Sequence, residues 1–442
     1  MRTSSRLCAV LVVAVAAAGC GKKQETDKAP AAGSAAAGSA AAGSAAAGSA
    51  ATAPAEPLTM PPPPAQVGTL ECKQSCTVTG SLDDAMIDAL RTQLGTRQLE
   101  LAGATNDDLV RITRLADLVT DLDVRESDAI TDLSPLARLT KVEKLWLMKL
   151  PNATDLAPIG ALTHLTKLTL HQQGFTSSAF FAGLRDLQEV SIYMPPDVVT
   201  EVAGLAGLPA LTKLELYAAK QVSDLAPLAE LPALRELSLY GSTGITDLGP
   251  VGKLTGLTQL SLYGVKAKDL SPIASLTNLE KIWLYATAFD DYTPLAKLTK
   301  LKSLRAGMSR FDRLDVIASM PALEELELWR DPVTDFVALV GADSLTSLTL
   351  RDVAFDDLSI LAKLDHLRRL DIGGCKVGEA MAISTLPELA ELRLDGAEGI
   401  EDLADFAALP KLRSIHVKKG QFPDAQIKAL KAERPQVRID GA

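Results

Sequence analysis

Aromatic residues are scarce in this chain, at 4 % of its 442 residues. A core built on large rings is therefore excluded, and aliphatic side chains must fill it. Histidine occurs only four times, and its copies lack the spacing of metal ligands. The Gly-x-Ser-x-Gly, phosphate-loop and His-Glu-x-x-His motifs are all missing from the sequence. We therefore expect no enzyme, no metal site and no cofactor.

Basic residues are outnumbered by acidic ones. The chain has 45 Lys and Arg against 55 Asp and Glu, a formal net charge of −10. A protein of this sign repels phosphate backbones, so nucleic acid is not an expected partner.

Cysteine occurs five times, and the copies differ in their expected roles. Cys72 and Cys76 form a close pair, which in an exported protein predicts a disulfide. Two cysteines without nearby histidines make a poor zinc site. Cys375 is left alone, and we expect it to be a buried turn residue rather than a reactive thiol.

The first 19 residues are organised as a targeting signal. Arg2 and Arg6 form a basic segment that precedes an apolar run of 12 residues at 7–18, and this run is too short to span a bilayer. The run ends in Ala17-Ala18-Gly19-Cys20, which resembles a bacterial lipobox, although Ala17 replaces the usual Leu. This resemblance implies cleavage before Cys20 and acylation of that cysteine. An ordinary secretory signal, with Cys20 incidental, is the alternative.

Gly21 follows the proposed lipid site. By analogy with Gram-negative lipoproteins, it is not the Asp that retains a protein at the inner membrane. We therefore expect an exported, lipid-anchored protein of the bacterial outer membrane, on its periplasmic face or at the cell surface.

Residues 20–68 form a lipid-anchored tether in this interpretation. Four Ala/Gly/Ser units occupy 31–50, and four prolines follow at 61–64. Such a segment has too little apolar surface for a core, so we expect it to be disordered. A flexible coil of this length spans roughly 40 Å on average, which would hold a folded domain off a membrane surface.

One apolar pattern, Leu-x-x-Leu-x-Leu, recurs through the rest of the chain with a period of 22 to 24 residues. Its copies begin at residues 142, 165, 187, 211, 234, 257, 279, 301, 323, 345, 367, 389 and 412, with a weaker one at 119. The period predicts a solenoid in which short strands stack into a parallel sheet about 65 Å long.

We expect residues 69–442 to form one repeat domain. Its N-terminal cap covers about 69–103, its repeats about 104–420 and its C-terminal cap about 421–442. Amphipathic helices are expected in both caps, near 81–94 and 424–435, with Ser81 as the N-cap of the first.

The second half of each repeat is also regular. Six aspartates each precede a proline by three residues, and these are Asp132, Asp155, Asp224, Asp247, Asp269 and Asp291. Their fixed register with the proline predicts turns in which the carboxylate holds backbone N–H groups, rather than a metal or acid–base array. We expect Ser134, Ser271 and Thr293, directly before the proline, to cap a short helical turn.

The two halves of the repeat together resemble the leucine-rich repeats of bacterial internalin-type surface proteins, over roughly residues 96–420. The resemblance implies an α/β-type solenoid, a leucine-rich repeat horseshoe with a concave parallel β-sheet and short helical turns or loops on the convex side. Helix–strand caps close both ends in this interpretation. The family binds other macromolecules.

One feature departs from the family pattern. Such repeats carry Asn shortly after the last strand Leu, whereas this chain has other residues there, including Ala219, Ser242, Asp331 and Cys375. We therefore expect other groups to satisfy the backbone of these turns.

The aromatic residues concentrate at the outward positions of the expected strands. Five of the six tyrosines follow the last strand Leu of consecutive repeats, and all three tryptophans lie on the same side. These residues are Tyr193, Tyr217, Tyr240, Tyr263, Tyr285, Trp146, Trp283 and Trp329. They can stiffen the sheet by stacking across strands, or form an exposed stripe that binds a partner. We expect binding, and both interpretations can hold at once.

Around and beyond Gly307 the same face becomes charged, with Arg305, Arg330, Arg351, Arg369 and Arg393 among Asp and Glu residues. The mixed signs exclude a phosphate-binding strip. A solvated face with weak ion pairs is one interpretation, and a polar flank that adds specificity to the stripe is the other.

The sequence thus predicts a monomeric cell-envelope lipoprotein that binds an unidentified protein partner through its concave face. Glycan or peptidoglycan binding by the aromatic stripe, or a purely structural envelope role, are the alternatives. The membrane is contacted by the lipid anchor only.

Overall fold

The computed structural model describes residues 67–95, 97–355, 357–378 and 380–441. The chain divides into two units, Met1–Pro62 and Pro63–Ala442, and every described residue belongs to the second. The expected leader, Cys20 and nearly all of the tether therefore lie outside the described residues. The last tether positions, Val67 and Gly68, pair with Ser81.

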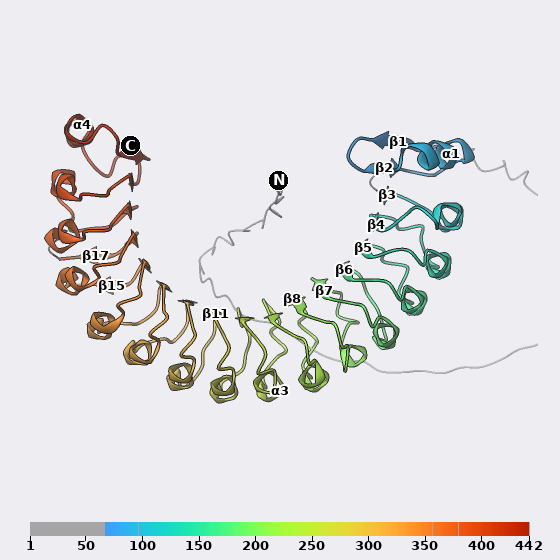
Figure 1. The fold of residues 1–442 in the computed structure, drawn as a ribbon, viewed down its shortest axis with the longest axis horizontal. Helices are drawn as coiled ribbons and strands as arrows, with labels where there is room; N and C mark the ends of the chain where they lie inside the picture. Colours follow the sequence, from blue (N-terminus) through green and yellow to red (C-terminus); the bar gives the residue numbers. More distant parts are fainter. Residues whose placement is uncertain (1–66, 96, 356, 379, 442) are drawn as a thin grey trace, which may run out of the picture. The chain divides into compact units, whose positions relative to one another are not determined.

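The second unit is a solenoid whose strands line the inner side of an arc, with short helices on the outer side (Figure 1). Its described residues include an 18-stranded sheet, in which β1 pairs antiparallel with β2 and all later neighbours pair in parallel. The strands are β1 (Thr69–Cys72), β2 (Cys76–Thr79), β3 (Gln98–Ala102), β4 (Asp121–Arg125), β5 (Lys144–Met148), β6 (Lys167–His171), β7 (Glu189–Tyr193), β8 (Lys213–Tyr217), β9 (Glu236–Ser238), β10 (Gln259–Ser261), β11 (Lys281–Tyr285), β12 (Ser303–Gly307), β13 (Glu325–Trp329), β14 (Ser347–Arg351), β16 (Arg369–Asp371), β18 (Glu391–Arg393), β19 (Ser414–His416) and β20 (Arg438–Asp440). A separate parallel pair joins β15 (Ala354–Phe355) and β17 (Lys376–Val377).

The leucine period accounts for this sheet. Alternate strand residues point to opposite faces, and the parallel register aligns Ile282, Leu304 and Leu326 of neighbouring strands. These three side chains are fully buried, and burying each contributes about 1.5–3 kcal/mol. The expected leucine-rich repeat solenoid is therefore confirmed, with one continuous core running behind the sheet.

Short helices occupy the convex side of the repeats. The α-helices are α1 (Asp84–Gln93), α2 (Asn106–Ile112), α3 (Gly249–Gly252) and α4 (Asp424–Glu433). The 3-10 helices are η1 (Thr113–Leu115), η2 (Ser134–Arg138), η3 (Ala157–Ala161), η4 (Ala179–Gly183), η5 (Ala203–Leu205), η6 (Ala226–Glu230), η7 (Ser271–Ser275), η8 (Thr293–Lys297), η9 (Asp315–Ser319), η10 (Val337–Gly341), η11 (Leu358–Lys363), η12 (Ala380–Thr385) and η13 (Leu403–Ala408). None of the described helices is long and apolar enough to cross a membrane.

The aspartates before the prolines hold the first turn of these helices. The carboxylate of Asp132 accepts hydrogen bonds from the backbone N–H and the hydroxyl of Ser134, both at 2.8 Å. These two bonds lower the pKa of the Asp132 carboxyl. The same arrangement joins Asp269 to Ser271 and Asp291 to Thr293. The capping expected of Ser134, Ser271 and Thr293 is therefore wrong, because their hydroxyls donate to the aspartate that accepts the backbone N–H.

Most strands are followed closely by a residue with left-handed backbone, at the point where the chain turns out of the sheet. Non-glycine residues adopt it at Met194 (φ 45°), Ala218 (φ 55°) and Met308 (φ 50°), and glycine adopts it at Gly241 and Gly264. A non-glycine residue held in this region costs about 1–3 kcal/mol.

Several kinds of polar group satisfy the turns where the family carries Asn. The Ser242 hydroxyl accepts from the Ala219 N–H at 3.1 Å and donates to the Leu216 carbonyl at 2.8 Å. A carboxylate oxygen of Asp331 accepts from the Ser309 N–H at 2.9 Å. The expectation that other groups replace the Asn ladder is thus confirmed.

Each end of the repeat array carries a helix beside a strand, α1 with β2 and β3, and α4 with β19 and β20 (Figure 1). The N-cap of α1 is Asp83, which accepts from the Met86 N–H at 2.8 Å, rather than the expected Ser81. A disulfide joins Cys72 to Cys76, as predicted. Cys375 is a buried free thiol, also as predicted.

Candidate functional site: the aromatic concave face

The concave face is built from the first, third and fifth residues of the five-residue strands and from the equivalent repeat positions where a strand is shorter. The parallel register places equivalent residues in columns, as in the pairing of Tyr193 with Tyr217 across β7 and β8. The fifth positions of five successive repeats carry Tyr193, Tyr217, Tyr240, Tyr263 and Tyr285. We call this column the aromatic ladder. All five side chains are partly exposed.

The centre of the aromatic ladder is tightly stacked. The rings of Tyr217 and Tyr240 lie 4.3 Å apart and 5° from parallel, and those of Tyr240 and Tyr263 lie 4.1 Å and 16° apart. The outer pairs, Tyr193 with Tyr217 and Tyr263 with Tyr285, are tilted at 5.7 and 5.9 Å. Such pairs contribute about 0.5–1.5 kcal/mol each beyond their burial. The stiffening role considered from the sequence is therefore present in the structure.

Carboxylates anchor both ends of the aromatic ladder. The Tyr193 hydroxyl donates to Glu215, which also accepts from the Ser191 hydroxyl at 2.8 Å and lies 3.1 Å from the Lys213 ammonium. Burial raises the pKa of Glu215, but these three partners outweigh it, so that its pKa is lowered and the carboxylate is charged. At the other end the Tyr285 hydroxyl donates to Glu327 at 2.6 Å.

Gly307 makes the second anchor possible. Tyr285 lies on β11 and Glu327 on β13, so the tyrosine ring must cross β12 at its fifth position, which is Gly307. A Cβ at Gly307 would lie 2.6 Å from Cδ1 of Tyr285. Burial and then the bond to Glu327 raise the pKa of Tyr285. The sequence signal for this contact is a glycine that interrupts an aromatic column.

A hollow of about 350 Å³ opens beside the stacked centre of the aromatic ladder. Its floor is formed where the third strand positions shrink to Ser238 and Ser261, and Tyr240, Glu236 and Trp283 line its walls. No sequence motif indicates this hollow, because it arises from the small side chains between the larger ones.

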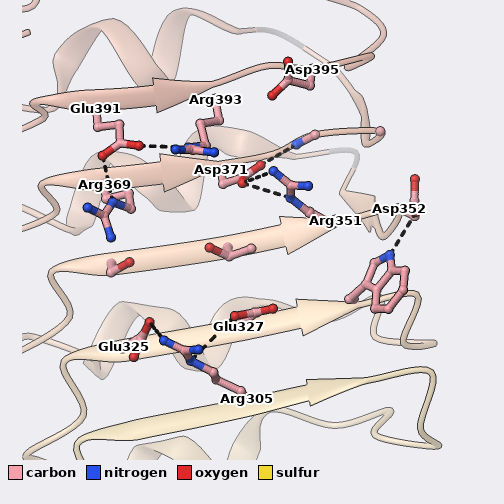
Figure 2. A pocket seen from close by; sticks show the side chains of 15 residues that line it. Arg305, Glu325, Glu327, Arg351, Asp352, Arg369, Asp371, Glu391, Arg393 and Asp395 are labelled. Atoms are coloured by element: carbon pink, nitrogen blue, oxygen red, sulfur yellow. Dashed lines mark hydrogen bonds and ion pairs between the residues drawn. The ribbon is translucent and has the colours of Figure 1, made fainter. Parts of the chain in front are cut away.

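A larger groove of about 760 Å³ lies on the same face over β12 to β18, which we call the charged groove (Figure 2). Arg351 reaches the buried Asp371 with Nη2 at 2.6 Å, and this hydrogen bond raises the pKa of Arg351. Arg305 contacts Glu325 at 2.6 Å, and Arg369 and Arg393 both contact Glu391. The ion pairs expected on this face are thus present.

The tryptophans are distributed over the face rather than gathered at one point. Trp283 lines the hollow, and Trp329 lines the charged groove, where its indole N–H donates to Asp352 at 3.1 Å. Trp146 lies on β5, two strands before Tyr193, between Asp123 and Thr169. The structure therefore brings Trp283 to the aromatic ladder, places Trp329 beyond its end and leaves Trp146 apart.

Among the described residues between 67 and 441, no group of three or more His, Cys, Asp or Glu side chains is arranged to hold a metal ion. Among the histidines, His171 meets Tyr193 edge to face at 6.2 Å, and burial lowers its pKa.

Comparison with solved structures identifies the fold. An internalin from Listeria monocytogenes is 27 % identical, with a TM-score of 0.59, and the match covers 69 % of this chain and 88 % of that chain. A leucine-rich repeat protein of Leptospira interrogans is 18 % identical with a TM-score of 0.58, over 81 % of this chain and 98 % of its own. A chain of the Drosophila Toll–Spatzle complex is 16 % identical with a TM-score of 0.59, over 83 % of this chain and 53 % of its own. The fold is an internalin-like leucine-rich repeat fold. Neither a protein-family model nor a curated protein matches the sequence.

Proposed function

We propose that this chain captures a protein partner on the concave face of its leucine-rich repeat domain. The observation that carries the proposal is the aromatic ladder, where the fold gathers five of the six tyrosines as stacked and partly exposed side chains. Tyr and Trp are the side chains most enriched at binding hot spots. A solved complex of similar fold, Toll with Spatzle, supports a partner of this class.

The test is replacement of Tyr217, Tyr240 and Tyr263 by Ser in the mature chain. Photo-crosslinking in the native envelope first identifies the bound protein, and its affinity for both forms is then measured by calorimetry. Because a single hot-spot side chain contributes about 2 kcal/mol or more, the affinity should fall at least about 30-fold.

A matched control replaces three exposed convex residues from repeats that carry the aromatic ladder, Glu230, Lys253 and Lys297, by Ser. It should bind normally. Unchanged affinity of the tyrosine variant, with its fold intact by circular dichroism, contradicts the proposal.

A glycan partner is the second candidate, and the hollow is the observation that favours it. An aromatic wall at Tyr240 and Trp283 with hydroxyl and carboxylate groups at Ser238, Ser261 and Glu236 suits a sugar ring. Binding of purified peptidoglycan that is lost on Trp283→Ala would support this candidate over a protein.

We also propose that the protein is exported and lipid-anchored at Cys20, at the outer membrane. The basic start, the short apolar run and Ala-Ala-Gly-Cys at 17–20 support this. Cys20→Ser should abolish incorporation of labelled fatty acid and release the protein from the membrane fraction. Labelling that persists in this variant contradicts the proposal.

A further inference from the structure

A second row of residues runs beside the aromatic ladder, along the edge where each strand turns. It consists of the left-handed residues that directly follow the fifth strand positions. Over the repeats of the aromatic ladder and the one after them, the row is apolar or lacks a side chain, and we call this part the apolar edge: Met194, Ala218, Gly241, Gly264, Ala286 and Met308. Before it the row is polar, with Lys149 and Gln172, and after it the row is charged, with Arg330 and Asp352.

The methionines at the two ends of the apolar edge present apolar side chains to solvent. Both have positive φ, where glycine would be unstrained. Both are also exposed, Met194 to 42 % and Met308 to 38 %, so burial does not compensate the strain. The left-handed backbone itself recurs along the whole row and belongs to the repeat turn. What distinguishes the two methionines is an exposed, flexible thioether chain, which suits a contact surface.

The charged groove begins where the apolar edge ends, at β12 and β13. Six carboxylates and four guanidinium groups line it, a net charge of −2 when all are ionised. Each guanidinium has a carboxylate within 2.9 Å. Asp395 forms no ion pair within 4 Å with any residue that the structure describes. Arg330, outside the groove lining, pairs with Asp352 at 2.9 Å. The positive charge of the groove is therefore already engaged, and Asp395 remains as its surplus negative charge.

We propose that the partner docks through one protein segment with two chemically distinct parts. An apolar part covers the aromatic ladder and the apolar edge, and an adjoining part bearing Lys or Arg enters the charged groove. Charge complementarity selects the basic part. Because the charged groove follows the aromatic ladder and the apolar edge along the concave face, the apolar and basic residues of the segment should form two separate, consecutive blocks in its sequence. This inference rests on the proposed protein-binding function and adds the chemistry of the occupant.

Peptide selection on the full mature chain tests the occupant directly. The probe is a display library of random 15-residue peptides, and the readout is the composition of the enriched sequences. We expect an apolar block next to a Lys- or Arg-rich block. Enrichment of acidic sequences, interleaved patterns or no sequence at all overturns the inference, as does binding of peptidoglycan fragments alone.

Variants locate the two contacts on the chain. Met194→Gly with Met308→Gly removes both side chains and relaxes their backbone, so the selected peptides should bind at least tenfold more weakly while Tm is unchanged or higher. Lys149→Gly is the matched control, because Lys149 has the same backbone conformation (φ 53°) outside the apolar edge. It should leave peptide affinity unchanged.

Asp395→Asn tests the charged groove. This variant should weaken the selected peptides about tenfold and reduce the salt dependence of their binding, while peptides truncated to the apolar block bind as before. Full affinity in both the methionine and the carboxylate variants, with binding lost in Tyr240→Ser/Tyr263→Ser, overturns the inference and leaves the proposed function intact. Full affinity in the tyrosine variant removes the proposed function itself.

Discussion

Gly307 offers a direct test of how the aromatic ladder is fixed. In Gly307→Ala the new Cβ would lie 2.6 and 2.8 Å from Cδ1 and Cε1 of Tyr285 and 3.1 Å from Cβ of Trp329. The Tyr285 ring must therefore swing off β12, and its hydroxyl leaves Glu327. A hydrogen bond to a charged group contributes about 1.5–3 kcal/mol, and we expect the lower end because Tyr285 is partly exposed.

A double-mutant cycle isolates this energy from the general effects of Gly307→Ala. Tyr285→Phe should destabilise the native chain by about 1.5 kcal/mol and the Gly307→Ala background by nearly zero. Urea unfolding followed by the fluorescence of the neighbouring Trp283 and Trp329 measures both values. The pKa of Tyr285, followed by its ultraviolet absorbance, should fall toward the ordinary tyrosine value in Gly307→Ala.

Equal destabilisation by Tyr285→Phe in both backgrounds would refute the reasoning. Gly341→Ala is the control, because a Cβ at Gly341 meets no atom within 4 Å. In the Gly341→Ala background, Tyr285→Phe should lower the free energy of unfolding as much as it does in the native chain.

Three further predictions concern the turns. Burial raises the pKa of Asp331, one of whose oxygens is buried without a hydrogen bond among the described residues. The folded chain therefore keeps the Asp331 proton to a higher pH than the unfolded chain does. The free energy of unfolding should fall as pH rises from the unfolded to the folded pKa of this carboxyl. Asp331→Asn should raise the free energy of unfolding at neutral pH by about 1 kcal/mol and remove that slope, measured by urea unfolding across this pH window. The pKa values of Asp132, Asp269 and Asp291 are lowered, so these carboxylates stabilise the folded chain at neutral pH and that stability is lost as pH falls through their folded pKa values. Replacing all three by Asn should therefore make Tm less dependent on pH on the acid side. Burial raises the pKa of the Cys375 thiol to about 11, and iodoacetamide should label it only after unfolding; rapid labelling of the native protein would contradict this.

The sequence predicted the elements that depend on period alone. Alternation along each strand was enough to align the buried leucines and to place Tyr217, Tyr240 and Tyr263 in one exposed column. The columns follow from repeat length, which the sequence states directly.

Contacts that depend on side-chain direction were not predictable in this way. Tyr285 bypasses its neighbour to reach Glu327, and the hollow over Ser238 and Ser261 is a shape left by small residues. The capping expected of Ser134 was wrong because its hydroxyl donates to Asp132, whose carboxylate also accepts from the Ser134 N–H, and a local pattern does not decide which polar side chain the hydroxyl contacts.

The parallel register also bears on how this surface can change over generations. Each of the five repeats of the aromatic ladder contributes one rung by the same pairing, so duplication or deletion of one of them would lengthen or shorten the ladder by one strand spacing of about 4.8 Å. Neighbouring rungs would keep their geometry, since each repeat pairs only with the next. The length of the aromatic ladder can therefore change during evolution by whole repeats, without substitutions in the repeats that remain.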